Sequence, residues 1–73
     1  MATVATSSAV EQIGDTAGAV WKILKKQGPL SMARLVKAVG EPHDTVMQSL
    51  GWLAREDKIL IEIKGRSRIV LLR

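Results

Sequence analysis

The period at which apolar residues recur changes once along the chain, from a helical repeat to an alternating one. In the first part, four apolar residues share one helix face: Ile13, Ala17, Val20 and Leu24. The pattern predicts a helix over residues 9–26, with Ser8 as its N-cap and Glu11 at the capping-box position three residues later. Gly28 is expected to end this helix, and the small, polar residues 1–8 are expected to be disordered.

Two shorter helices are predicted next. Ser31 is a suitable N-cap for a helix over residues 32–39, and Gly40 suits the left-handed turn that ends it. A third helix is expected from Pro42, a residue favoured at the first helical position, to about Glu56. Three apolar residues form its inward stripe: Val46, Leu50 and Leu53.

After a left-handed turn expected at Asp57, apolar residues alternate with period two, which is typical of strands. Three isoleucines define one face of the first strand: Ile59, Ile61 and Ile63. A tight turn at Gly65 and Arg66 leads into a return strand with Ile69 and Leu71 on one face. Because a two-stranded hairpin is not stable alone in water, its apolar face is expected to lie against the helices.

These elements predict an α+β fold over residues 9–73, with a three-helix core followed by a two-stranded antiparallel β-hairpin. Only about two residues, Gly40 and Glu41, join the second and third helices, which forces a sharp crossing. The stretches GPLSMARLVKAVG and EPHDTVMQSLGWLAREDKI, followed by a short hairpin, resemble the winged helix-turn-helix superfamily. VWKILKKQGPLSMARLVKAV and LGWLAREDKI further resemble a group of small, uncharacterised, stand-alone prokaryotic winged-helix proteins, over about residues 13–64. The resemblance implies this fold, and DNA binding as the commonest use of the superfamily.

Composition narrows the classes of function. The chain has 73 residues and no cysteine, which leaves room for one domain and excludes a thiolate metal site and a thiol nucleophile. No apolar run reaches the roughly 20 residues of a bilayer span, and the N-terminus lacks the features of a secretory signal, so a cytoplasmic location is expected. We find no phosphate loop, metal-ligand spacing or nucleophile motif. The sequence therefore predicts a protein that is not an enzyme and uses no cofactor, metal, membrane or small-molecule ligand.

The net charge of +4 lies wholly at the C-terminal end. Residues 1–57 hold six basic and six acidic side chains, whereas residues 58–73 hold five basic and one acidic. Three of these basic residues surround the predicted hairpin turn: Lys64, Arg66 and Arg68. They can bind the phosphates or the minor groove of DNA, or they can keep an exposed edge strand soluble and unpaired. The sequence leaves both interpretations open.

In winged helix-turn-helix proteins the third helix usually enters the major groove, so its outward residues become candidates for DNA contact. Five residues of the third helix are assigned in this way: His43, Thr45, Gln48, Ser49 and Arg55. Gln48 can pair with adenine, but residues 42–56 carry one basic and two acidic side chains. The sequence predicts a DNA-binding module, a small transcriptional regulator or accessory factor, that depends more on its hairpin than on this helix.

A second face of the first helix supports an alternative function. Gly14, Gly18 and Trp21 are spaced to lie together, and each glycine inside a helix costs about 1 kcal/mol relative to alanine. Close approach of another backbone would offset this cost, either from the chain's own hairpin or from a second copy. Trp52 is expected on the solvent side of the third helix, where an exposed tryptophan can anchor a partner. The alternative is a protein-interaction or homodimerisation module that keeps the fold without specific DNA binding.

Overall fold

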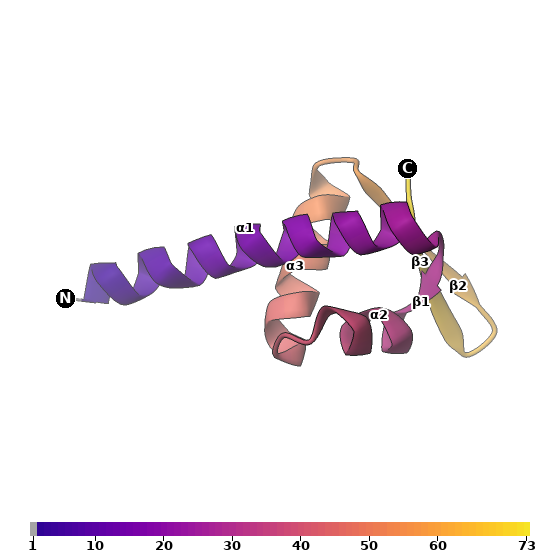
Figure 1. The fold of residues 1–73 in the computed structure, drawn as a ribbon, viewed down its shortest axis with the longest axis horizontal. Helices are drawn as coiled ribbons and strands as arrows, with labels where there is room; N and C mark the ends of the chain where they lie inside the picture. The colour runs from indigo at the N-terminus through magenta and orange to yellow at the C-terminus, as the bar shows by residue number, and fades with distance from the viewer. Residues whose placement is uncertain (1) are drawn as a thin grey trace.

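The computed structural model describes the backbone of residues 2–73 and the side chains of residues 9–73. In this part of the chain, three helices and three short strands follow one another: α1 (Ala2–Gln27), β1 (Leu30–Ser31), α2 (Met32–Val39), α3 (His43–Arg55), β2 (Ile59–Lys64) and β3 (Ser67–Leu72). The helices pack together at one end of α1, and the β2–β3 hairpin extends from them as a wing (Figure 1). This arrangement confirms the predicted α+β winged-helix fold.

The helix α1 is longer than the sequence predicts, because it begins at Ala2 and not at Ala9. Ser8 therefore lies within the helix and does not cap it, and residues 2–8 continue the helix where disorder was expected. No glycine or proline separates Ala2 from Ala9, so local sequence gives the helix no reason to stop at Ser8. The first half of α1 projects beyond the packed helices, and the molecule measures 44 Å along its longest axis and 20 Å across it (Figure 1).

The helix α2 spans the predicted residues, and its two ends explain why. The Ser31 hydroxyl accepts a hydrogen bond from the backbone N–H of Arg34 at 3.3 Å, as an N-cap does. At the other end Gly40 adopts the left-handed conformation, with φ of 74°, and donates its N–H to the carbonyl of Val36. Both signals are local, so the sequence was sufficient to place this helix.

We predict opposite effects of the same substitution at two glycines, Gly40 and Gly51. A Cβ added at either position would meet no described atom within 4 Å apart from its own neighbouring backbone, so backbone conformation decides the result. Gly40→Ala is expected to lower the free energy of unfolding by about 1 kcal/mol, because alanine is strained at positive φ. Gly51→Ala, within α3, is expected to raise it by about 1 kcal/mol through helix propensity. Urea denaturation of both variants measures the two shifts, and shifts of the same sign would contradict this assignment.

The helix α3 begins one residue later than predicted. Pro42 has an extended ψ of 141° and takes the N-cap position, so His43 is the first helical residue. The carbonyl of Pro42 accepts the first helical hydrogen bond, from the N–H of Val46 at 3.1 Å. After the helix, Asp57 adopts the predicted left-handed turn, with φ of 61°.

A three-stranded antiparallel sheet follows the order β1-β3-β2, so β3 is its central strand. The sequence predicted the β2–β3 hairpin and its turn at Gly65 and Arg66, but not β1. That strand contains only Leu30 and Ser31, the two residues just before α2, and so short a stretch has no sequence pattern that predicts its pairing with β3. The hairpin is therefore connected to the helices in two ways. The chain runs from α3 into β2, and β3 pairs with β1, which directly precedes α2.

The face of β3 that packs on the helices is opposite to the predicted one. Val70 is fully buried and Leu72 packs against the core, whereas Ile69 and Leu71 lie on the other face of the sheet. The run from Ile69 to Leu72 is apolar at every position, so its pattern cannot choose a face. The pairing of Val70 with Leu30 of β1 determines which face of β3 is buried, because a shift of one residue in the register exchanges the two faces of a strand.

The wing extends past the helices, so they cover only the first residue of β2. Ile59 is 2% exposed, but Ile61 and Ile63 are 40% and 78% exposed. The expectation that all three isoleucines pack against the helices is therefore wrong for Ile61 and Ile63. The outer half of the hairpin is surrounded by solvent on both faces.

The core lies where the three helices meet the base of the hairpin. It contains nine buried apolar residues: Ala17, Val20, Leu24, Leu35, Val46, Leu50, Leu53, Ile59 and Val70. The inward stripe predicted for α3 is confirmed, as is the α1 stripe apart from Ile13, which is half-buried. None of the helices described is both long and apolar enough to cross a membrane.

Candidate functional site

The tip of the wing carries three exposed cations: Lys64, Arg66 and Arg68. Arg66 lies in the turn, whereas Lys64 pairs with Ser67 and Arg68 pairs with Ile63 across the hairpin. Cross-strand partners share a face, so Lys64 and Arg68 lie on opposite faces of the wing. No ion pair within residues 9–73 involves these three side chains, so their charges are available to an external anion.

The surface of α3 is much less basic. His43, Gln48 and Arg55 are exposed as predicted, and Thr45 is half-buried. The His43 Nδ1 atom lies 3.8 Å from a carboxylate oxygen of Asp44, so an acidic group stands at the start of the helix. The side chains described include no cluster of three metal-ligating residues there or elsewhere. This helix offers amide and imidazole groups for hydrogen bonding and little attraction for phosphate.

Ser49 does not belong to this surface, and its assignment to DNA contact is wrong. The side chain is fully buried, and its hydroxyl lies 2.8 Å from the carbonyl oxygen of Thr45 and 3.1 Å from that of Ile13. It thereby joins α3 to α1 at a place where a larger residue would hold the helices apart. The signal was present in the sequence, because Ser49 lies three residues after Val46 and four before Leu53 on the inward stripe.

The two sets of candidate DNA contacts lie on separate elements. The wing cations are at the tip of the hairpin, and α2 lies between that hairpin and the beginning of α3 (Figure 1). The structure therefore presents a basic cluster and a polar helix surface as two distinct patches. Only the first of them carries an excess of positive charge.

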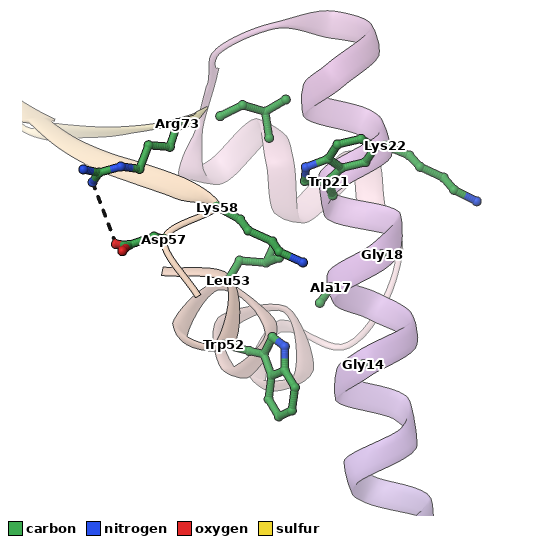
Figure 2. A pocket seen from close by; sticks show the side chains of 11 residues that line it. Gly14, Ala17, Gly18, Trp21, Lys22, Trp52, Leu53, Asp57, Lys58 and Arg73 are labelled. Atoms are coloured by element: carbon green, nitrogen blue, oxygen red, sulfur yellow. Dashed lines mark ion pairs between the residues drawn. The ribbon is translucent and has the colours of Figure 1, made fainter. Parts of the chain in front are cut away.

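The four residues predicted for interaction line one groove (Figure 2). This groove, of about 700 Å³, lies between α1, the last turn of α3 and the C-terminal end of the chain. Gly14, Gly18 and Trp21 come from α1, and Trp52 comes from α3. We refer to it as the tryptophan groove. The spacing in the sequence indicated the α1 residues, but only the tertiary structure adds Trp52 to them.

The chain's own hairpin does not cover the two glycines. A Cβ at Gly14 or Gly18 would meet no described atom within 4 Å, which removes the hairpin as the backbone that approaches them. Trp52 is 50% exposed. Trp21 is half-buried, and the Lys25 ammonium lies 4.7 Å from the centre of its ring, within the range of a cation–π contact. The groove is thus open and partly aromatic.

Four charged residues border the tryptophan groove, with a net charge of +2: Lys22, Lys58, Arg73 and Asp57. Arg73 lies 3.9 Å from Asp57 in an exposed ion pair. Figure 2 shows the Lys58 side chain reaching between the two tryptophans, whereas Lys22 points away from the groove. A partner that carries negative charge would therefore be favoured here.

Comparison with known proteins agrees with the fold. A family model described as "Winged helix-turn-helix domain (DUF2582)" matches residues 9–72. The chain is also 32% identical over 65 residues to the uncharacterized protein MJ1608 of Methanocaldococcus jannaschii, an alignment that covers 85% of this chain and 91% of that protein. No solved structure matches the chain.

Proposed function

The chain belongs to the winged helix-turn-helix domain family that matches residues 9–72, and from this membership we propose that it binds double-stranded DNA. It would act as a small transcriptional regulator or accessory factor and not as an enzyme. The observation that carries the proposal is the cluster of exposed, unpaired cations at the tip of the wing. Fold membership alone does not decide function, so the proposal depends on this cluster.

The wing would bind the DNA backbone. Arg66 at the turn and Lys64 and Arg68 on opposite faces can each reach a phosphate when the hairpin lies along or within a groove. Contacts of this kind supply affinity and orientation but no direct information on base sequence. We therefore expect the affinity to depend strongly on salt and weakly on sequence.

The helix α3 would contribute a small amount of base selection. The amide of Gln48 is exposed and can donate to and accept from one adenine in the major groove. His43 and Arg55 are exposed as well and can contact the backbone. Asp44 would oppose these contacts, because its exposed carboxylate repels phosphate. Because Ser49 is buried, Gln48 is the best candidate on α3 for a direct contact with a base.

Titration of a labelled DNA duplex with the protein tests the proposal directly. Fluorescence anisotropy is measured at about 50 mM and about 200 mM salt, the range over which phosphate contacts change affinity most visibly. We expect binding at the lower salt, a marked loss at the higher salt, and similar affinities for duplexes of unrelated sequence. Absence of binding at the lower salt would exclude this function.

The tryptophan groove favours a second candidate function, that of a protein-interaction module. Trp52 is half exposed beside two uncovered glycines, and protein interfaces are enriched in exposed aromatic residues of this kind. This function needs no contact between the protein and DNA. It can therefore coexist with DNA binding or replace it.

A further inference from the structure

The tryptophan groove is open, and the first half of α1 projects beyond the packed helices (Figure 1). We propose that they cover each other in a dimer, so that the first half of α1 from one copy lies in the tryptophan groove of a second copy. Since Gly14, Gly18 and Trp21 of the groove are themselves on α1, each α1 is both the inserted helix and one wall. The two α1 helices then run antiparallel about a two-fold axis, as in an isologous interface.

The shape of α1 fits this arrangement. Val10 lies four residues before Gly14 on the same helix face and is 53% exposed. Gly18 lies four residues after Gly14, and the space beside both glycines is open. When Gly14 of the two copies meet at the axis, Val10 of each copy lies opposite Gly18 of the other. An exposed apolar side chain thus meets a position without a side chain, which allows the helices to approach closely.

The aromatic walls complete the groove around such a helix. Trp21 follows Gly18 along α1, and Trp52 faces α1 from the last turns of α3 (Figure 2). Burying the remaining exposed surface of a large aromatic side chain against a partner contributes a large favourable free energy of association. The inserted helix would exclude water from both indoles.

Charge favours a second copy as the occupant. Residues 1–21 contain the acidic Glu11 and Asp15 and no lysine or arginine. Arg73 and Asp57 form an ion pair at the border of the groove, and the Lys58 side chain reaches into the groove and makes it basic (Figure 2). The acidic half of α1 would therefore enter a basic groove, and the exchange repeats at the symmetry-related site. Attraction of this kind selects orientation as well as partner.

The length of α1 gives a further reason for a partner. The backbone of its first turns projects beyond the packed helices, and an isolated helical segment of that length is only marginally stable in water (Figure 1). Packing in the groove of a second copy would stabilise it.

Sedimentation equilibrium of the full chain without DNA tests the proposal, over protein concentrations from about 1 µM to about 1 mM. We expect the wild type to dimerise within this range. Gly18→Leu is expected to weaken the dimer at least about tenfold, because a leucine fills the place of the partner's backbone. The matched control is Gly51→Leu, the same change at an exposed helical glycine outside the groove, and it should dimerise as the wild type does.

Charge is tested with a second matched pair. Glu11→Lys is expected to weaken the dimer at least about tenfold, because it places a cation against the basic groove. Glu62→Lys makes the same change of charge on the wing and should leave the dimer unaffected.

Circular dichroism separates loss of the dimer from loss of the fold. Gly18→Leu should remain folded, since its Cβ meets no described atom within 4 Å beyond the backbone of its own helix, and leucine favours a helix. A wild type that is monomeric at about 1 mM, or a Gly18→Leu variant that dimerises like the wild type, would overturn the proposal. Equal weakening by Gly18→Leu and Gly51→Leu would also overturn it. None of these results bears on DNA binding, which is measured separately.

Discussion

Replacing Arg66 and Arg68 together with alanine is expected to lower the affinity of the protein for duplex DNA about 100-fold at low salt. Both side chains are exposed at the tip of the wing and have no ion-pair partner in the described structure, so their full charge can act on phosphate. The dependence of log affinity on log salt should also decrease, by about 0.9 for each phosphate contact that is lost. Fluorescence anisotropy at several salt concentrations measures both effects.

The control is the double variant Lys25→Ala and Lys26→Ala, which removes the same charge from the last turn of α1. Its affinity should change less than about threefold, because charges more than about 10 Å from the DNA are largely screened. Equal losses in the two double variants would mean that net charge, and not the wing, determines binding. That result would remove the wing from the proposed interface and leave DNA binding itself in place.

Replacing Leu35 with alanine is expected to lower the free energy of unfolding by about 3 kcal/mol. Leu35 is fully buried and is the one buried residue of α2, so its side chain is the main attachment of that helix to the core. A domain of this size has a total stability of only about 4–11 kcal/mol, at about 0.05–0.15 kcal/mol per residue. The variant should therefore unfold at a much lower urea concentration than the wild type.

Ile63→Ala is the matched comparison, because Ile63 is a branched aliphatic residue that is 78% exposed. We expect it to change the free energy of unfolding by less than about 0.5 kcal/mol. Similar costs for the two substitutions would contradict the packing of α2 described above.

Sequence reasoning was most accurate where a structural feature depends on neighbouring residues. The ends of α2 were placed to the residue, because Ser31 and Gly40 act through their own backbone and side chain. The start of α1 was misplaced for the complementary reason. A capping residue permits a helix to begin but does not force one to, and Ser8 is preceded by residues that continue the helix.

Features that depend on distant residues were harder to obtain. The apolar run of β3 gave no preference between its faces, and the buried face was fixed by a partner strand some forty residues earlier in the chain. Ser49 was assigned to the outward face of the third helix, although its buried hydroxyl bonds to the backbone of α1. The spacing of Gly14 and Gly18 identified a special helix face, but only the structure shows that this face is uncovered and that Trp52 lies across from it.

The position of the two tryptophans makes the protein its own optical reporter. The chain contains no tyrosine, so Trp21 and Trp52 are its only strongly fluorescent side chains, and both line the same groove. A partner that enters the groove would exclude water from both indoles and shift their emission to shorter wavelength, without any attached dye. DNA held by the wing alone would leave that emission unchanged, so a single unlabelled sample distinguishes the tryptophan groove from the tip of the wing.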